Sequence, residues 1–131
     1  MSERILQEIE ILKKFYSSIE FNDDKNWALI PSYRLPTGYG WGPEIIPVCL
    51  MIPNGYPGTN PYGIYVPSDI KVNGQVPGNF NSSPGNLPPF KGSWGILSWT
   101  LDPWKPSADI QQGSNLLNFV QSFYRRFQEG I

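Results

Sequence analysis

The chain has 131 residues, a length that fits one domain with a single hydrophobic core. Ten basic and eleven acidic residues give a formal net charge of −1, and the basic residues are scattered, so the sequence lacks the positive stripe that a nucleic acid partner requires. One cysteine and no histidine exclude an intramolecular disulfide, a Ser-His-Asp triad, a Cys-His dyad and a histidine-ligated zinc site.

An amphipathic helix is the first predicted element, over residues 2–19. Ser2 is a suitable N-cap, and glutamates follow it early in the segment. The apolar residues recur at steps of three and four, as one buried face of a helix requires: Ile5, Ile9, Leu12, Tyr16 and Ile19. We expect this face to pack against a sheet.

Two strands are predicted next. Residues 26–35 alternate loosely between apolar and polar and are rich in aromatic and branched side chains, which is typical of a half-buried strand. After a turn over residues 36–42, residues 44–52 form a continuous apolar run that we interpret as a central strand. Pro47 has no N–H group, so we expect this strand to lie at an edge or to contain a bulge.

Residues 53–89 are so rich in proline and glycine that the sequence predicts an irregular segment. Only short extended pieces are expected in it, such as residues 63–67 and residues 69–74. A tryptophan-rich stretch then occupies residues 93–101.

A second helix is predicted after the tryptophan-rich stretch, beginning near Asp109 or Ser114 and stopping at Gly130. Its buried stripe should consist of Leu116, Leu117, Val120, Phe123, Tyr124 and Phe127. The order of elements predicts an α+β domain in which an N-terminal and a C-terminal helix pack against an antiparallel sheet of about four strands.

Two short motifs resemble the ubiquitin-conjugating (UBC) fold. In that fold a strand ends in a proline, and a Tyr-Pro pair and another proline follow, as do Pro53, Tyr56, Pro57 and Pro61 here. Downstream, "DPWKPSADI" resembles the Trp-x-Pro segment that follows the active-site residue of the family. With the N-terminal helix, the resemblance covers most of the chain and implies one UBC-like domain over residues 1–131. It is greatest to the divergent prokaryotic branch, which is encoded beside ubiquitin-like proteins and activating enzymes.

The resemblance implies a transferase that receives the C-terminus of a ubiquitin-like protein from an activating enzyme and passes it to a target protein. The family's acceptor is a cysteine shortly before the tryptophan, but here the segment holds Ser98, six positions before Trp104. A serine would carry the acyl group as an oxyester. We therefore expect Ser98 to be the acceptor, with Ser93 as the second candidate. The alternative for Ser98 is a loop hydroxyl bonded to local backbone.

A serine acceptor needs a general base, because its hydroxyl stays protonated near neutral pH. Without histidine, the base is expected among Asp102, Lys105 and Asp109. The family also supplies an asparagine that stabilises the oxyanion of acyl transfer. In this chain the irregular segment offers three, each of which is equally a turn-forming residue: Asn79, Asn81 and Asn86.

Trp94, Trp99 and Asn86 are the expected partner-binding residues, as the lining of a groove for an extended tail. The alternative for both tryptophans is plain core packing, since an indole buries a large apolar area. Trp104 precedes Lys105-Pro106 and is expected to anchor the loop. Cys49 lies within the apolar run and is expected to be an inert core residue.

No cofactor and no metal are expected, because no carboxylate cluster has metal-site spacing and "GYPGTNPYG" lacks the Gly-Lys-Ser/Thr ending of a phosphate loop. The apolar runs are too short to span a bilayer and the N-terminus is too charged for a secretion signal, so a cytoplasmic protein without a membrane partner is expected. Two other functions stay open. One is a catalytically inactive UBC-fold module that recruits a ubiquitin-like protein or an activating enzyme, and the other is a small scaffold domain.

Overall fold

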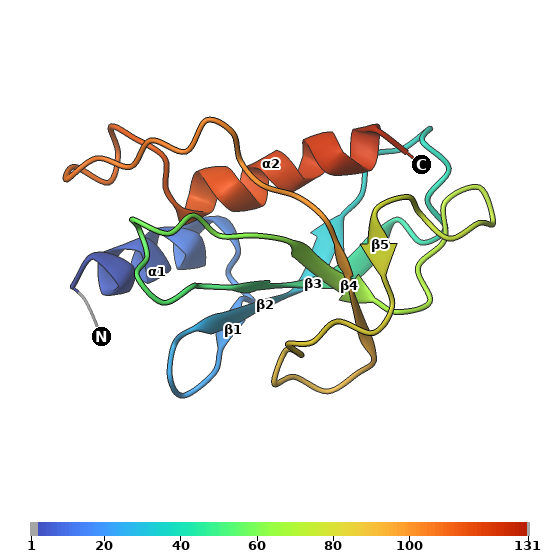
Figure 1. Cartoon of the computed structure of the whole chain (residues 1–131), viewed down its shortest axis with the longest axis horizontal. Coiled ribbons are helices and arrows are strands. Elements are labelled where there is room, and N and C mark those ends of the chain that lie inside the picture. Colours follow the sequence, from blue (N-terminus) through green and yellow to red (C-terminus); the bar gives the residue numbers. More distant parts are fainter. Residues whose placement is uncertain (1–2, 131) are drawn as a thin grey trace.

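Two helices pack on one face of an antiparallel sheet (Figure 1). The structure is a computed structural model that describes residues 3–130. In chain order the elements are α1 (Glu3–Phe15), β1 (Glu20–Phe21), β2 (Trp27–Arg34), β3 (Ile45–Met51), β4 (Ile64–Pro67), β5 (Phe80–Asn81), β6 (Trp94–Leu97) and α2 (Leu116–Gln128). The strand order is β1-β2-β3-β4-β6-β5, with every neighbouring pair antiparallel. The α+β class predicted from the sequence is confirmed.

The number of strands differs from the prediction: the sheet of the described residues has six strands, not four. β2, β3 and β4 coincide with segments expected to be extended, whereas residues 69–74 contribute only isolated bridges at Val72. β6 lies in the tryptophan-rich stretch, and β1 and β5, with two residues each, lie at the two edges of the sheet. A strand of two residues is too short to show an alternating pattern, so nothing in the sequence marks it as a strand.

Pro47 sits inside the sheet, because β3 pairs with β2 on one side and with β4 on the other. The register between β2 and β3 shifts by one residue between Ile30 and Tyr33, at the level of Pro47. A bulge of this kind accommodates a strand residue that has no N–H to donate. Of the two outcomes expected for Pro47, the bulge is the one observed.

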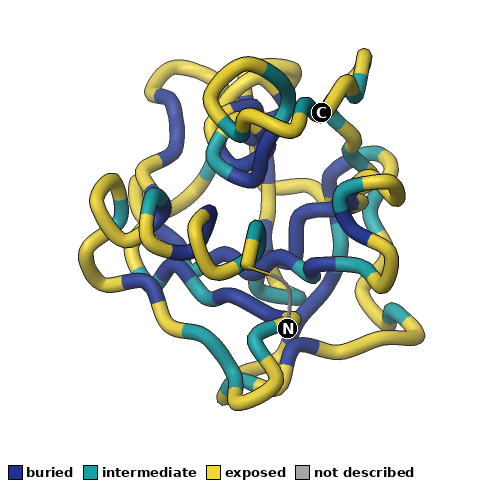
Figure 2. Tube along the Cα trace, turned by 90° about the vertical axis from the view of Figure 1, so that its left-hand side faces the viewer, coloured by how far each residue is buried: buried dark blue, intermediate teal, exposed yellow. Residues whose placement is uncertain are grey.

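Alternating side chains give the sheet two different faces. The helix-side face carries Ala28, Ile30, Val48, Leu50, Ile64, Val66 and Leu97, which pack against apolar residues of α1 and α2 in the main core. On the opposite face Trp27, Cys49, Tyr65 and Trp94 form a smaller buried cluster, with Met51, Phe90 and Ile96 partly buried around it. Figure 2 shows the buried residues gathered between these elements, while the connecting loops are exposed. The site described below opens on this second face.

The two helices are shorter than their sequence patterns. α1 ends at Phe15, and Tyr16 and Ile19 join the core from the turn that follows. The expected N-cap, Ser2, lies outside the described residues. At the other end of the chain, Gly130 has φ +77° and its N–H donates to the carbonyl of Phe127, which confirms the predicted stop.

α2 begins at Leu116, within two residues of the nearer predicted start, and its N-cap is Asn115, whose side chain accepts a 2.8 Å bond from the N–H of Asn118. The predicted stripe is buried or half-buried except for Tyr124, which is 43% exposed. Phe119 is buried instead, because it lies three residues after Leu116 and four before Phe123, on the same face of the helix.

A buried carboxylate, Glu8 of α1, ties the two helices to the loop that carries the Tyr-Pro motif. Its oxygens accept bonds of 2.8 and 2.9 Å from the Tyr56 hydroxyl and one of 2.6 Å from the N–H of Leu116, the first residue of α2. Arg4 donates to the same carboxylate at 2.8 Å and also to backbone carbonyl oxygens of the segment before α2. Glu8 is 2% exposed, so these bonds replace its water.

Candidate active site

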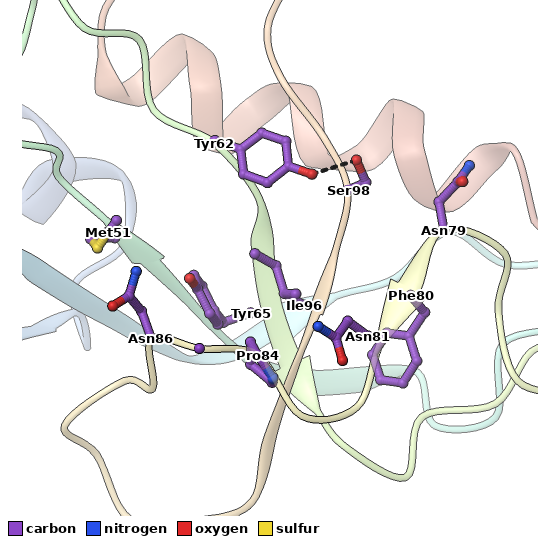
Figure 3. Close-up of a pocket in the computed structure, with 11 residues that line it drawn as sticks. Met51, Tyr62, Tyr65, Asn79, Phe80, Asn81, Pro84, Asn86, Ile96 and Ser98 are labelled. Atoms are coloured by element: carbon purple, nitrogen blue, oxygen red, sulfur yellow. Dashed lines mark hydrogen bonds between the residues drawn. The ribbon is translucent and has the colours of Figure 1, made fainter.

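A cavity of about 500 Å³ opens on the sheet face opposite the helices (Figure 3). The strands supply its floor with Met51, Tyr65 and Ile96, which are side chains of the second face. Its walls come from residues 79–86, and Tyr62 and Ser98 also line it. The favoured acceptor therefore lies in a cavity, together with the segment that contains the candidate asparagines.

Ser98 reaches the cavity because its two neighbours are held in the main core. Leu97, the last residue of β6, is fully buried. Trp99 packs against the same core, and its indole N–H donates a 2.9 Å bond to the Ser122 hydroxyl of α2. Side chains alternate in an extended segment, so the residue between them turns to the opposite face. Ser98 is accordingly exposed, and its backbone N–H donates to the carbonyl of Asn79 at 2.9 Å.

The Ser98 hydroxyl is hydrogen-bonded to the Tyr62 hydroxyl at 2.7 Å, with either atom able to donate (Figure 3). Tyr62 is held in place by Gly63, which has φ +87° and donates its N–H to the carbonyl of Trp99 at 2.7 Å. A Cβ at position 63 would lie 2.4 Å from the Ile96 Cδ1 atom, so glycine is required there. Sequence reasoning missed Tyr62, because no local motif marks it and its pairing depends on how β4 and β6 align.

The three candidate asparagines all line the cavity, and two of them also shape the backbone. Asn79 has φ +52°, a left-handed conformation that asparagine tolerates better than most residues. Asn81 accepts a 2.9 Å bond from the N–H of Ser83, which closes a local turn. Asn79 and Asn81 therefore combine the expected turn role with a position in the cavity lining. Asn86 lies across the cavity, beside Met51 and Tyr65 (Figure 3).

The expected general bases are not brought together with Ser98. Asp102, Lys105 and Asp109 do not line its cavity and belong to the loop before α2, drawn in orange in Figure 1. Asp109 accepts a bond from the N–H of Gln111, and the Lys105 N–H donates to the Ser114 hydroxyl. None of the three expected bases is therefore among the side chains that line the cavity of Ser98.

Trp104 holds that loop in place. Its indole N–H donates a 2.9 Å bond to the carbonyl of Pro57, and its ring lies 5.9 Å from that of Tyr56. The Tyr-Pro and Trp-x-Pro motifs are therefore packed against each other, and Trp104 has the anchoring role expected for it. The same contact fixes the segment around Trp104 to the Tyr56-Pro57 turn.

Trp94 and Trp99 are largely packing residues. Trp94 is 6% exposed and donates its indole N–H to the carbonyl of Phe90, so it offers little surface to a partner. Trp99 is half-buried, with the guanidinium carbon of Arg125 6.0 Å from its ring centre. Ser93 is exposed and lines, with Trp94, a separate cavity of about 390 Å³. Of the three predicted partner-binding residues, Asn86 is the one in the cavity of Ser98.

The cavity of Ser98 is lined by uncharged side chains. Burial, and then the neighbouring phenol of Tyr62, raise the pKa of Tyr65 in its floor. Cys49 lies beneath the same face, fully buried, and burial raises the pKa of its thiol, which agrees with the inert core role expected for it. The site therefore offers hydroxyls, amides and aromatic rings, but no fixed charge.

Comparison with protein-family models, with curated proteins and with solved structures found no match to this chain. Within residues 3–130, no three or more histidine, cysteine or acidic side chains come close enough to hold a metal ion. Neither of the helices in that part of the chain has the length and apolar character needed to cross a bilayer.

Proposed function

We propose that the protein is a cytoplasmic UBC-like transferase of a bacterial ubiquitin-like conjugation pathway. It accepts the C-terminus of a ubiquitin-like protein from an activating enzyme on Ser98, as an oxyester, and passes it to a target protein. The observation that carries this proposal is the position of the Ser98 hydroxyl, exposed in an open cavity and hydrogen-bonded to Tyr62. The resemblance of the Tyr-Pro and Trp-x-Pro motifs to the UBC family supplies the class of substrate.

The lining of the cavity suits an extended peptide tail. Tyr62 and Phe80 offer aromatic contact area, and asparagine side chains offer amide donors and acceptors to a peptide backbone. Stabilising the oxyanion that forms when the Ser98 oxygen attacks the tail's carbonyl carbon would fall to an amide N–H of the asparagines that line the cavity. An activated thioester carries the free energy for this step, so the protein has to position the hydroxyl and provide a path for its proton.

Intact-mass analysis tests the proposal directly. The probe is a short synthetic peptide α-thioester ending in glycine, incubated with the wild type, with Ser98→Ala and with the matched variant Ser93→Ala, which changes a serine of the neighbouring cavity. Wild type and Ser93→Ala should gain the mass of the peptide acyl group, in a form that resists thiol reductants and is released by hydroxylamine. Absence of the adduct in the wild type, or its persistence in Ser98→Ala, refutes the acceptor role.

A second candidate is a non-catalytic UBC-fold module that binds the tail or the activating enzyme. It is favoured by one observation: the residues that line the cavity include no charged side chain to serve as a base for Ser98. This candidate predicts that the peptide in its free-acid form binds wild type and Ser98→Ala equally. Asn86→Asp places a negative charge in the cavity and should weaken that binding, measured by calorimetry; equal binding by Asn86→Asp excludes the cavity as the binding site.

A further inference from the structure

We infer that Tyr62 is a catalytic residue that relays the proton of Ser98 to the leaving group during acyl transfer. This inference rests on the proposed acceptor role of Ser98. It answers the difficulty that Asp102, Lys105 and Asp109, the expected bases, lie outside the cavity. The relay removes the need for a charged base, because the departing thiolate takes up a proton by way of the Tyr62 hydroxyl.

The contact between the two hydroxyls supports the relay. The Tyr62 Oη and Ser98 Oγ atoms are 2.7 Å apart, and either is able to donate. A phenol hydroxyl accepts one hydrogen bond while it donates another, so it takes a proton on one side as it releases one on the other. Tyr62 is 52% exposed, which leaves its outer side open to an incoming thioester. Figure 3 shows the phenol reaching Ser98 from the segment before β4.

Other titratable groups around the pair do not offer this route. Tyr65 is 3% exposed in the cavity floor. Behind the cavity, Arg126 of α2 is buried and donates to the carbonyl of Gly78, and Arg125 lies over the ring of Trp99. In the part of the chain that the structure describes, Tyr62 is the side chain that hydrogen-bonds the Ser98 hydroxyl.

The transfer step balances without a further reagent. The Ser98 oxygen attacks the carbonyl carbon of the tail's thioester, the new C–O bond forms, and the C–S bond breaks. The Ser98 proton moves to the Tyr62 oxygen while the Tyr62 proton moves to the departing sulfur. The products are the seryl oxyester and a free thiol. A thiolate is a good leaving group that takes up this proton near neutral pH, so the relay ends on a suitable acceptor.

The pH dependence of acylation distinguishes a relay from a structural role. With the relay, the wild-type rate constant is nearly independent of pH between about 6.5 and 8.5, because no hydroxide is consumed. In Tyr62→Phe, Ser98 loses its proton to hydroxide instead. The rate at about pH 7 should then fall roughly 100-fold and rise about tenfold per pH unit.

The experiment measures initial rates of Ser98 acylation by the same peptide thioester, with intact mass as the readout and hydrolysis of the thioester alone subtracted. Wild type is compared with Tyr62→Phe and with Tyr39→Phe, a matched control at an exposed tyrosine outside the cavity. Thermal unfolding of each variant checks that it is folded.

A slower Tyr62→Phe with the steep pH dependence, beside an unchanged Tyr39→Phe, supports the relay. Equal rates and profiles in wild type and Tyr62→Phe overturn the relay and leave the acceptor role of Ser98 standing. A slower Tyr62→Phe with a flat profile also overturns it, since Tyr62 then only positions the hydroxyl. A wild type that forms no Ser98 adduct overturns both proposals.

Discussion

Replacing Glu8 with alanine should destabilise the fold strongly, because this carboxylate satisfies three donors at the junction of the two helices. The variant leaves the Tyr56 hydroxyl and the Leu116 N–H buried without an acceptor. Each such donor costs about 1–3 kcal/mol, so the free energy of unfolding should fall by about 4 kcal/mol. The variant also leaves the Arg4 guanidinium without its carboxylate. This loss adds less to the cost than a fully buried charge would, because Arg4 is 16% exposed and regains some water.

Equilibrium unfolding in urea, followed by tryptophan fluorescence, measures this loss from the transition midpoint and the slope. Tyr56→Phe removes one donor but keeps the carboxylate bonded to Leu116 and Arg4, so it should cost about 2 kcal/mol. Glu10→Ala is the matched control: Glu10 lies on the same helix, 67% exposed and 3.3 Å from Lys13, and its loss should cost less than about 0.5 kcal/mol.

The reasoning is refuted if Glu8→Ala loses less than about 1 kcal/mol with an unchanged slope, because the three bonds would then contribute no more than exposed ones. A double-mutant cycle between Glu8→Ala and Tyr56→Phe sharpens the test. The two losses should be clearly non-additive, since the phenol and the carboxylate bond each other at 2.8 Å.

Two further changes probe the core and the cavity. Burial raises the pKa of the Cys49 thiol and of the Tyr33 and Tyr56 phenols, so the folded protein keeps protons that the unfolded chain loses above about pH 9–10. Below that range the three groups are protonated in both states, and the free energy of unfolding does not depend on pH through them. Above it, the free energy of unfolding should fall by about 1.4 kcal/mol per pH unit for each group. Urea unfolding between about pH 8 and 11 measures this fall, and a flat profile contradicts it. Gly63→Ala combines φ +87° with a Cβ 2.4 Å from Ile96 and should cost about 2 kcal/mol. Thermal unfolding measures that cost, and a transition temperature equal to wild type contradicts the need for glycine there.

Periodicity predicted the longer elements well, and tertiary packing decided the rest. β2 and β3 follow the predicted strands within one residue at each end, since their apolar, aromatic and branched side chains pack on both faces of the sheet. β1 and β5 were not predicted, because a pair of residues forms a strand only when a neighbouring strand supplies its hydrogen bonds. The late start of α2 was within reach of the sequence: Asn115 is a good N-cap, but two other plausible starts precede it.

The candidate site was likewise predictable only in part. Ser98 and the asparagines of residues 79–86 were predicted, because the family resemblance points to their segments and their side-chain chemistry singles them out within those segments. Tyr62 was not predicted, because its contact with Ser98 spans 36 residues and depends on the alignment of β4 with β6. The expected bases are absent from the cavity lining for the opposite reason. Asp102 and Lys105 are near Ser98 in sequence, but Trp104 fixes their loop to Pro57, beside α1.

The exposure of Ser98 is by itself weak support for function, since core packing alone produces it. Leu97 and Trp99 both pack on the helix side of the sheet, so the side chain of any residue at position 98 would point to the cavity side. Packing does not require the Tyr62 hydroxyl to lie 2.7 Å from that of Ser98. The fold would be equally stable if this half-exposed tyrosine pointed into solvent and made no bond to Ser98. The Tyr62–Ser98 pair, rather than the tryptophans of residues 94–104, is therefore the feature on which the acyl-transfer proposal depends.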